Sequence, residues 1–400
     1  MRILVPVFFH APMGGLHHHV LATTRHVLRA GHEVTIVCKP GPFADKARNL
    51  GARVITTDYQ TNDVHRLLRQ LIKEPFDLVY AHPFDSRQIG LAVAEVQHIP
   101  FVLVIHGMYD DDLPYYINQT SHVIVVAEAI AKYLIERCAS VHDKMTVLMN
   151  GVDESYTITP QPTPRDRIRA TFVSRMDADM VFPLDVLLDG VGDERIQDVP
   201  IDWTFVGTGT QREKYEARFD DELEGTNQSI HWAGWLESDE VADRMRQSDF
   251  VVAPSRAAIE SLALGRPTIA AGSKGYHGLI TEDTWVDAEA TNYGGIGTRH
   301  ASYRRGALGD EVLKLLDVEF RHRTAAFSAS LAKRYEDEVI QECLMSLFDR
   351  VVKEGPRPSP IDYAAARYEQ LHLHRANALL ARRLSARDEK LKQLRNDIEE

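Results

Sequence analysis

The chain is poor in cysteine and has no long hydrophobic run. Its three cysteines, Cys38, Cys138 and Cys343, lie far apart and form no C-x-x-C spacing. This usage fits a reducing compartment better than a disulfide framework. No run reaches the roughly 18 apolar residues that a membrane span requires, and MRILVPVFFH contains no apolar segment that ends at a small-residue cleavage site. We therefore expect a cytoplasmic protein.

An excess of positive charge is also missing. The 46 Lys and Arg are outnumbered by 58 Asp and Glu, so the formal net charge is −12. Such a chain has no general basic field that attracts a phosphate backbone, and we expect no nucleic-acid partner. Its hydrophobic fraction of 44% and charged fraction of 26% are typical of a globular protein. A length of 400 residues favours two domains with additional segments.

Short hydrophobic runs alternate with helix-period segments through the first half of the chain. Such segments include His18–Ala30, Val64–Ile72 and Arg87–Gln97. Nearly continuous apolar strands separated by helices indicate a parallel sheet that is covered on both faces. The predicted strands are Ile3–Phe9, Glu33–Cys38, Arg53–Thr57, Leu78–Ala81, Phe101–Ile105, Val123–Ala127 and Met145–Met149.

The same rhythm restarts after a Pro-rich stretch, ITPQPTPRDR, which reads as a linker. The predicted strands here are Thr171–Val173, Asp202–Val206, Ile230–Ala233, Phe250–Ala253 and Thr268–Ala271. The predicted helices are Leu184–Leu188, Ser238–Arg246 and Ala258–Leu264. We therefore predict an α/β fold of two doubly wound, Rossmann-like domains whose carboxyl strand ends face a central cleft.

These patterns divide the chain into five segments. We expect a first domain at 1–157, a linker at 158–169, a second domain at 170–330 and a terminal helix at 331–354 that could pack back on the first domain. The last segment, 355–400, is a predicted helical tail.

The tail carries an apolar seam with alternating spacings of three and four residues. This a/d-like pattern, with two polar interruptions, favours a coiled coil and hence a homo-oligomer. A solvated helix is an alternative, and the locally basic stretch Arg375–Arg395 leaves open a peripheral contact with the inner face of the membrane. The seam consists of Leu373, Asn377, Leu380, Leu384, Arg387, Leu391, Leu394 and Ile398.

The first strand leads into FFHAPMGGLHHHV, which contains a Gly-Gly pair before a predicted helix. Gly14 and Gly15 would let the backbone approach a ligand, and the following helix N-terminus favours an anion, although a simple turn explains the pair equally well. The motif does not match G-x-G-x-x-G. The run His17–His19 invites a metal hypothesis, but adjacent helical residues point in different directions, so we expect no metal site.

Two histidines follow neighbouring runs. His106 comes directly after Phe101–Ile105, and His82 has the analogous place after Leu78–Ala81. A histidine at such a place can hydrogen bond a polar ligand or transfer a proton, whereas the alternative is a structural histidine with satisfied hydrogen bonds.

The second half places further candidates after its strands. Arg175 in FVSR could make paired hydrogen bonds to a diphosphate, or it could form a surface salt bridge. Gly207 and Gly209 in FVGTG allow a close approach to a ligand or simply form a turn. The stretch PSRAAIESLALGRP places Glu260 early in a helix, where a surface glutamate is the alternative.

Taken in order, these motifs resemble the glycosyltransferase family 4 branch of the GT-B fold over roughly residues 1–350. NGVD, just before the second domain, is the most specific of them. The motifs that carry the resemblance are Pro12–Gly15, Gly31–Val34, His106–Gly107, Asn150–Asp153, Phe172–Arg175, Phe205–Gly209, Trp232–Trp235 and Ala253–Gly272.

The resemblance implies retaining transfer of a sugar from a nucleotide diphosphate sugar to a carbohydrate, lipid-linked or small-molecule acceptor, in glycan or polysaccharide synthesis and without a metal cofactor. Gly15, with Gly14, looks like the loop beside the donor phosphates, and His106 looks like the histidine near the transferred sugar. Arg175 resembles the diphosphate-binding arginine. Glu260 matches the glutamate that binds the ribose hydroxyls, for which a carboxylate offers two acceptor oxygens.

The chain departs from the family pattern at two positions. The family usually has a first glutamate eight positions before the ribose-binding one, where this chain has Val252. It also usually has a lysine shortly after the diphosphate arginine, whereas MDADMVFP follows Arg175. We expect Arg256 or Lys274 to supply that positive charge from a loop, beside Ser255 in the Pro-Ser turn. These departures keep two alternatives open: a non-catalytic binding or scaffold protein, and a nucleotide-sugar epimerase.

Overall fold

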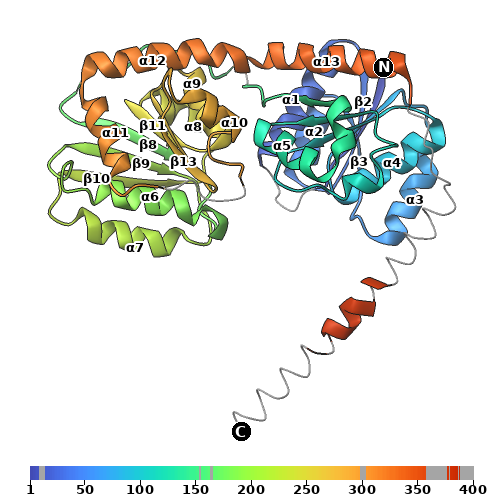
Figure 1. Cartoon of the computed structure of the whole chain (residues 1–400), viewed down its shortest axis with the longest axis horizontal. Coiled ribbons are helices and arrows are strands. Elements are labelled where there is room, and N and C mark those ends of the chain that lie inside the picture. Colours follow the sequence, from blue (N-terminus) through green and yellow to red (C-terminus); the bar gives the residue numbers. More distant parts are fainter. Residues whose placement is uncertain are drawn as a thin grey trace, which may run out of the picture. The chain divides into compact units, whose positions relative to one another are not determined.

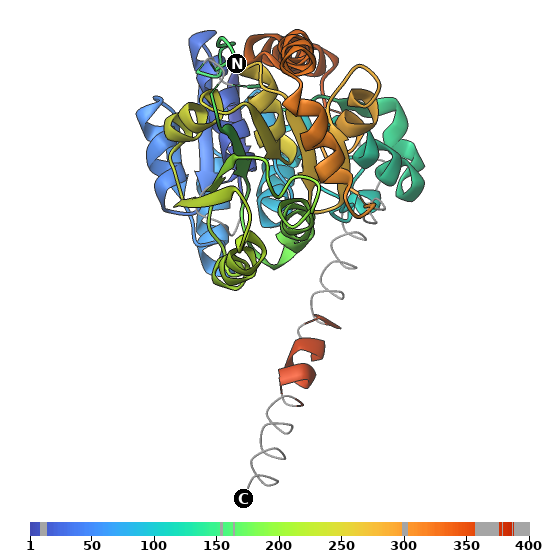
Figure 2. The same ribbon diagram turned by 90° about the vertical axis from the view of Figure 1, so that its left-hand side faces the viewer.

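The computed structural model describes residues 1–8, 14–152, 155–162, 165–297 and 303–356, together with 376–377, 379–385 and 387. Residues 1–356 form one compact unit and residues 357–400 a second. The first unit contains two sheets, each with helices on both faces (Figures 1 and 2). Each sheet defines a domain, which we call the N-terminal and the C-terminal domain.

The N-terminal domain is built on a seven-stranded sheet in the order β3-β2-β1-β4-β5-β6-β7. All neighbouring strands are parallel. Apolar residues fill its central strands because both faces are covered. The strands are β1 (Arg2–Pro6), β2 (Glu33–Cys38), β3 (Arg53–Thr56), β4 (Leu78–Ala81), β5 (Phe101–Ile105), β6 (His122–Val125) and β7 (Met145–Val147).

Helices connect these strands in βαβ fashion. The first of them ends at Arg29 with Ala30 as its C-cap, and Gly31 follows with a φ of +79°, a left-handed conformation that favours glycine. The helices are α1 (Gly15–Arg29), α2 (Pro42–Asn49), α3 (Thr61–Leu71), α4 (Asp85–Gln97) and α5 (Glu128–Arg137), with 3₁₀ turns η1 (Leu113–Tyr115) and η2 (Ala139–Lys144).

The C-terminal domain has a six-stranded sheet in the order β10-β9-β8-β11-β12-β13. Five strands are parallel, and β13 pairs antiparallel with β12 at the edge. The edge strand was not predicted because GYHGL lacks a strand-like apolar pattern. The strands are β8 (Ile168–Val173), β9 (Ile201–Val206), β10 (Gln228–Gly234), β11 (Phe250–Ala253), β12 (Thr268–Gly272) and β13 (Gly275–Leu279).

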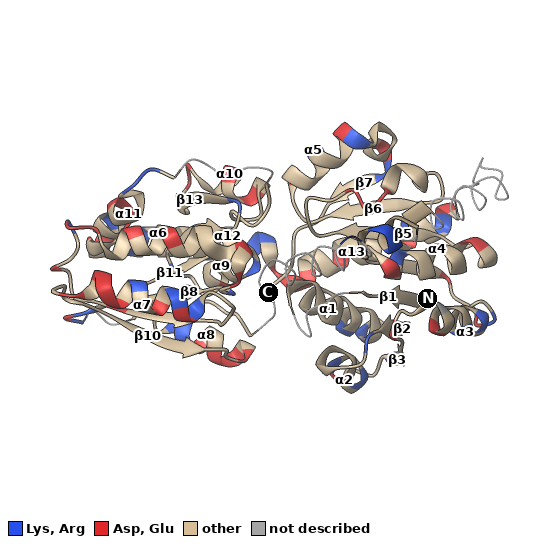
Figure 3. Cartoon of the chain, turned by 90° about the horizontal axis from the view of Figure 1, so that it is seen from below, with Lys and Arg blue, Asp and Glu red and all other residues tan. Residues whose placement is uncertain are grey.

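The helices of this domain enclose two apolar clusters, one on each face of the sheet. One of them, α8, begins with a capping box in which Glu240 accepts a hydrogen bond from the Glu237 backbone N–H at 3.0 Å. Acidic and basic residues both occur along α7 (Figure 3). The helices are α6 (Val181–Val191), α7 (Arg212–Leu223), α8 (Ser238–Arg246), α9 (Ser255–Ala263), α10 (Trp285–Ala290), α11 (Ala307–Leu316) and α12 (Val318–Ala332), with 3₁₀ turns η3 (Ala178–Met180) and η4 (Lys333–Tyr335).

The chain crosses between the two domains twice. The second crossing leads through η4 into α13 (Asp337–Glu354), which packs against α1 and joins the apolar cluster of the N-terminal domain (Figure 1). The two crossings contact each other, because Val152 donates its N–H to the Tyr335 carbonyl at 2.7 Å. A Cβ on Gly151 would lie 2.9 Å from the Asp337 Cα, which explains the glycine of NGVD.

The boundaries of several elements differ from the prediction. α9 begins at Ser255, three residues before the predicted start, so Ser255 and Arg256 lie in its first turn and not in a loop. β8 begins at Ile168, two residues inside the predicted linker. Pro12 and Asp153 of the quoted motifs lie outside the described residues.

The described part of the tail is helical and exposed. Leu380 and Leu384 of the predicted seam expose 55% and 59% of their surface. The other seam positions, apart from Asn377 and Arg387, fall outside the residues that the structure describes. Among the helices that are described, none is long and apolar enough to cross a membrane.

Candidate functional site

Several of the predicted site residues follow strands at which a sheet reverses its winding, among them Gly14, Gly15, Arg175, Arg256 and Glu260. In the N-terminal sheet the reversal lies between β1 and β4, and in the C-terminal sheet it lies between β8 and β11. Gly14 and Gly15 follow β1, Arg175 follows β8, and α9 with Glu260 follows β11. Open parallel sheets bind their ligands at this point of the carboxyl edge.

The N-terminus of α1 is open to an approaching group. Gly14 caps the helix in an extended conformation, and Gly15 is its exposed first residue. A Cβ built on Gly15 would meet no atom within 4 Å. The first turn has no acidic side chain, so the positive end of the helix dipole is not neutralised locally.

Three histidines from separate elements form a cluster at the carboxyl edge of the N-terminal sheet. His106 after β5 stacks on His82 after β4, with ring centroids 5.3 Å apart and an interplanar angle of 16°. The His82 Nδ1 lies 3.2 Å from the His106 Nε2, so one ring donates to the other. His19 of α1 lies edge-on to His106 at 5.2 Å, and its Nε2 is 2.7 Å from the Tyr80 hydroxyl.

Burial keeps these imidazoles uncharged. It lowers the pKa of His19 to about 4, with a further contribution from the positive charge of Arg256. Burial, followed by the neighbouring histidines, holds the pKa of His82 and of His106 well below the ordinary value. A neutral imidazole can donate one hydrogen bond and accept another, so His106 suits contact with a hydroxyl group.

The histidine run of α1 does not gather as one group. His17 lies against Phe43, with ring centroids 4.6 Å apart, whereas His19 faces Tyr80 and the histidine cluster. In the part of the chain that the structure describes, no group of three His, Cys, Asp or Glu side chains could hold a metal ion. The place of His19 in the cluster was not predicted, because the sequence of the run does not show which of its histidines faces the sheet edge.

Arg175 extends from the carboxyl end of β8 and is exposed. Its Nη1 donates to Asp177 and its Nη2 to Asp179, each at 2.9 Å. Both carboxylates belong to MDADM, where the family usually has its lysine. The structure therefore places Arg175 at the expected edge but in an ion pair of its own loop, so a diphosphate would have to compete with two carboxylates.

Gly207 and Gly209 lie against protein backbone. A Cβ on Gly207, whose φ is +129°, would lie 1.9 Å from the Ser174 carbonyl oxygen, and a Cβ on Gly209 would lie 2.3 Å from the Met176 carbonyl carbon. The two loops are also hydrogen bonded, since Met176 donates its N–H to the Thr208 carbonyl at 3.0 Å. The sequence suggested that a ligand could approach these two glycines closely. In the structure the loop that carries Arg175 occupies that place.

The first two turns of α9 carry the paired charges of the site. The Arg256 Nε donates to the Glu260 Oε1 at 2.7 Å, and the two side chains are only 16% and 13% exposed. Ser255 starts the helix with a φ of +49°, in the region that disfavours non-glycine residues, and its N–H contacts the Tyr293 carbonyl. Strain of this kind gathers at functional sites.

Two further positions from the sequence analysis, Val252 and Lys274, flank α9 in the sequence. Val252 is buried in β11, so no side chain from that position reaches the edge of the sheet. Lys274 is exposed in the turn between β12 and β13, and its backbone N–H donates to the Gly294 carbonyl at 2.9 Å. Lys274 and Arg256 both follow strands of the carboxyl edge, but only Arg256 lies near His19 of the N-terminal domain.

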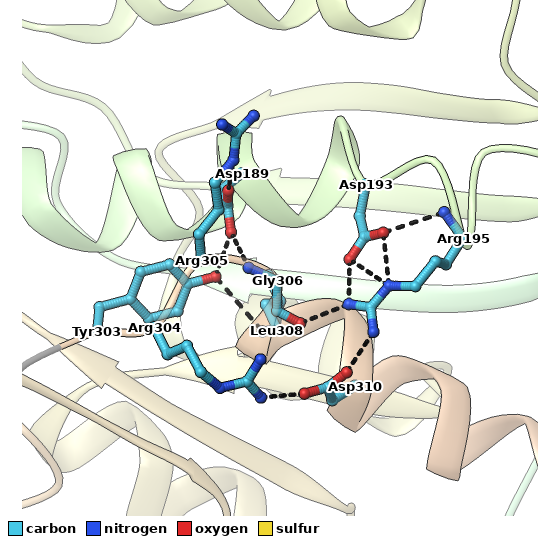
Figure 4. A network of polar contacts seen from close by, with 9 residues as sticks. All are labelled: Asp189, Asp193, Arg195, Tyr303, Arg304, Arg305, Gly306, Leu308 and Asp310. Atoms are coloured by element: carbon cyan, nitrogen blue, oxygen red, sulfur yellow. Dashed lines mark hydrogen bonds and ion pairs between the residues drawn. The ribbon is translucent and has the colours of Figure 1, made fainter.

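Two other features lie away from these edges. A cavity of about 910 Å³ is lined by the C-terminal half of α1 and by α12, and it includes Arg25, Lys333 and Glu336. A network of ion pairs joins the end of α6 to the start of α11, where Arg195 and Asp310 approach to 2.5 Å (Figure 4). Neither feature contains a predicted site residue.

Family models match both domains. The model described as Glycosyltransferase Family 4 matches residues 13–156, and the one described as Glycosyl transferases group 1 matches residues 167–292. An uncharacterized glycosyltransferase of Methanocaldococcus jannaschii is 22% identical over 322 residues, which are 70% of this chain and 84% of that protein.

Solved structures share the fold. A glycosyltransferase from Rickettsia africae has a TM-score of 0.69 at 15% identity, and the match covers 88% of this chain and 98% of that one. HepE from Anabaena, in complex with UDP and glucose, has a TM-score of 0.64 at 14% identity and is matched over its whole length by 88% of this chain. At these identities the likeness concerns the fold.

Proposed function

Because the chain is a family 4-like glycosyltransferase with the GT-B fold, we propose that it moves a sugar from a nucleotide diphosphate sugar to a hydroxyl acceptor with retention of configuration. The observation that carries this proposal is the placement of Gly15, Arg175 and Glu260 beside the reversal points of the two sheets. The donor would bind mainly to the C-terminal domain and the acceptor mainly to the N-terminal domain.

Glu260 would bind the ribose of the donor. Its carboxylate is held by Arg256 at 2.7 Å and is largely buried, so a vicinal diol could use its oxygen atoms without first ordering a mobile side chain. The likeness to HepE, solved in complexes with UDP and with UDP-glucose, supports a nucleotide diphosphate sugar as donor.

The diphosphate would meet the open N-terminus of α1 and the cations of the C-terminal domain. Gly15 leaves room for an anion beside the N-terminus of the helix. Arg175 would contribute if the diphosphate displaced Asp177 or Asp179 from its guanidinium. Arg256 lies near His19 across the two domains, and we propose that it supplies positive charge in place of the absent lysine, with Lys274 as the second candidate.

In this chemistry the main task is to stabilise the diphosphate leaving group and to hold the acceptor hydroxyl on the same face of the sugar. A carboxylate nucleophile of the kind used by retaining glycosidases is not required. His106, uncharged at neutral pH, would hydrogen bond the transferred sugar and would not act as a cation. We propose no metal cofactor.

Nucleotide binding tests the donor site directly. Thermal unfolding is measured with UDP, GDP and ADP and with their glucose or mannose conjugates, for the wild type and for Glu260→Ala. A ligand at about 100 times its Kd stabilises the wild type by about 2.7 kcal/mol, and we expect the variant to lose most of this shift. Glu224→Ala, an exposed glutamate at the far end of α7, is the matched control. An equal shift in wild type and Glu260→Ala would contradict the ribose assignment.

A non-catalytic binding protein is the second candidate. The ion pairs of Arg175 with Asp177 and Asp179 favour it, because they occupy the cation that the diphosphate would need. Such a protein would bind nucleotides without releasing nucleoside diphosphate from a nucleotide sugar. Release of the diphosphate by the wild type, with or without an added acceptor, would exclude this candidate.

The tail and the location are further proposals. We propose a homo-oligomer formed through the exposed seam of Leu380 and Leu384, and a cytoplasmic location with peripheral membrane contact as the alternative role of the basic tail. Sedimentation of the full chain would show whether it self-associates.

A further inference from the structure

Two exposed aromatic side chains lie in the loops that follow β4 and β5, one in each loop. Phe84 exposes 41% of its surface and Tyr115 exposes 76%. Phe84 contacts Tyr109, with ring centroids 5.0 Å apart. Because β4 and β5 are parallel neighbours, both loops begin at the carboxyl edge of the N-terminal sheet. We call Phe84, Tyr109 and Tyr115 the aromatic edge.

The aromatic edge adjoins His106. The Tyr109 ring folds over Gly107, where a Cβ would lie only 2.7 Å from the ring. The Tyr109 hydroxyl oxygen lies 3.4 Å from the His106 backbone nitrogen. A molecule that rests on the aromatic edge would therefore lie next to the histidine that we place beside the transferred sugar.

A buried ion pair holds the two loops together from beneath. Arg87 of α4 pairs with Asp111 at 3.3 Å, and the two side chains are 9% and 3% exposed. Asp111 also accepts hydrogen bonds from the Phe84 N–H at 3.0 Å and from the Tyr116 hydroxyl at 3.1 Å. A buried pair with this many hydrogen bonds fixes its loops in one arrangement.

The loops are fixed in conformations that are unfavourable on their own. Phe84, Asp111 and Asp112 have φ angles of +68°, +52° and +58°. A non-glycine residue in this conformation destabilises the fold by on the order of 1–3 kcal/mol, and it persists where the surrounding packing and hydrogen bonds hold it there. Beneath the loop Leu113 and Tyr116 are buried, whereas Tyr115 between them is exposed. The protein thus keeps an apolar ring in water at a defined position.

The charges around the aromatic edge are negative. Asp110 is partly exposed, and the Asp112 side chain is 73% exposed. Arg87 of α4 is buried against Asp111 and the Tyr116 ring and also approaches the Asp112 carboxylate at 3.7 Å, so the carboxylates of Asp110, Asp111 and Asp112 outnumber it. This rim repels phosphate and carboxylate groups and would be costly to desolvate against a lipid chain. The aromatic edge and its carboxylates suit a ligand ring whose C–H groups pack on the aromatic side chains and whose hydroxyl or amino groups donate hydrogen bonds to the carboxylates.

We propose that the aromatic edge binds the acceptor and that this acceptor is an uncharged or amino-substituted sugar ring. The ring stacks on Phe84, Tyr109 or Tyr115, the rim carboxylates accept hydrogen bonds from its substituents, and one hydroxyl group faces the donor sugar beside His106. This assignment rests on the proposed glycosyl transfer and names the class of its acceptor.

Binding of simple glycosides tests the proposal. Saturation-transfer NMR is recorded with the methyl glycosides of glucose, galactose, mannose, glucosamine and N-acetylglucosamine. We expect the wild type to bind at least one of them, and Phe84→Ala and Tyr115→Leu to weaken that binding about fivefold to tenfold through loss of ring stacking. Tyr115→Phe keeps the ring and is expected to retain binding.

The controls separate this proposal from the donor site. Val96→Ala removes an equally exposed apolar side chain at the opposite end of α4, 56% exposed, and should change nothing. The thermal shift with nucleotides should stay the same in all four variants. The proposal is overturned if no glycoside binds, if Phe84→Ala and Tyr115→Leu bind as the wild type does, or if Tyr115 instead governs binding to phosphatidylglycerol vesicles. Failure of the proposed function would appear separately, as absence of nucleotide binding in the wild type.

Discussion

At the carboxyl edge of the N-terminal sheet, His19, His82 and His106 are packed together and kept uncharged by burial. At the corresponding edge of the C-terminal sheet, Arg256 and Glu260 form a largely buried ion pair, and Arg175 forms exposed ion pairs with Asp177 and Asp179. Both sheets are doubly wound, so the difference lies in the side chains that follow their strands. It matches the two substrates we propose: an acceptor without negative charge on one side and an anionic diphosphate on the other.

The predicted site glycines of the two domains also differ in what lies next to them. Gly15 faces open space, whereas Gly207 and Gly209 touch the backbone of the neighbouring loop. The first glycine leaves room for a ligand, and the other two leave room for the protein itself.

The largest expected effect comes from exchanging these glycines for alanine. Gly207→Ala places a Cβ 1.9 Å from the Ser174 carbonyl oxygen at a left-handed φ, and we expect it to destabilise the protein by about 3 kcal/mol or more. Gly15→Ala should change stability by no more than about 0.5 kcal/mol while weakening nucleotide binding. Denaturant unfolding and nucleotide titration measure the two effects. A Gly15→Ala variant that binds nucleotide normally would remove the phosphate role of α1.

The neutral histidines predict a loss of stability in mild acid. The His19 pKa is about 4 in the folded protein and about 6.5 in the unfolded chain, so between these values only the unfolded chain binds the proton. Stability is therefore complete above pH 6.5 and falls as the pH drops toward 4, by on the order of 3 kcal/mol for His19 alone. Urea unfolding at pH 7, 6 and 5 measures the slope.

The acid effect can be assigned with two variants. His19→Gln should flatten the pH dependence, whereas His142→Gln, whose side chain is 70% exposed, should leave it as in the wild type. Equal slopes in all three proteins would show that His19 is not kept neutral by burial.

A smaller effect is expected from the cations of the donor edge. Arg256→Ala removes the partner of Glu260 and the charge near His19, and we expect nucleotide diphosphate to bind about tenfold more weakly. Lys274→Ala should weaken binding less, because its side chain is exposed. Calorimetric titration with UDP or GDP measures both. If neither variant loses affinity, the positive charge of the site comes from elsewhere.

The smallest effect should come from the network in Figure 4. Asp310 joins Arg195 and Arg304 on the surface, away from both carboxyl edges. Exposed ion pairs contribute little to stability, so Asp310→Asn should lower Tm slightly and leave nucleotide binding unchanged. A loss of binding in this variant would show that the two parts of the domain are coupled.

The sequence predicted the fold and the approximate positions of the strands other than β13, because the apolar runs are short and separated by helical periods. It also placed Glu260 after β11, since Phe250–Ala253 and the Pro-Ser pair mark the strand end clearly. It did not predict that α9 starts at Ser255, because a serine with a φ of +49° is fixed by a contact with Tyr293, far away in the sequence.

Other features of the site depend on tertiary neighbours. The role of Gly207 depends on the loop at Ser174, and the stacking of His82 on His106 depends on the pairing of β4 with β5. The ion pairs of Arg175 were foreseen as one of two outcomes, since the aspartates of MDADM stand next to it in the sequence. Their effect on activity is a matter for experiment.

The central claim is that this chain transfers a sugar from a donor held at Glu260. The most direct test is the release of nucleoside diphosphate from UDP- and GDP-sugars, with and without added glycosides, by the wild type and by Glu260→Ala. We predict release by the wild type from at least one donor, faster with an acceptor and lost in the variant. Binding of nucleotides without any release, or equal release by Glu260→Ala, would contradict the account.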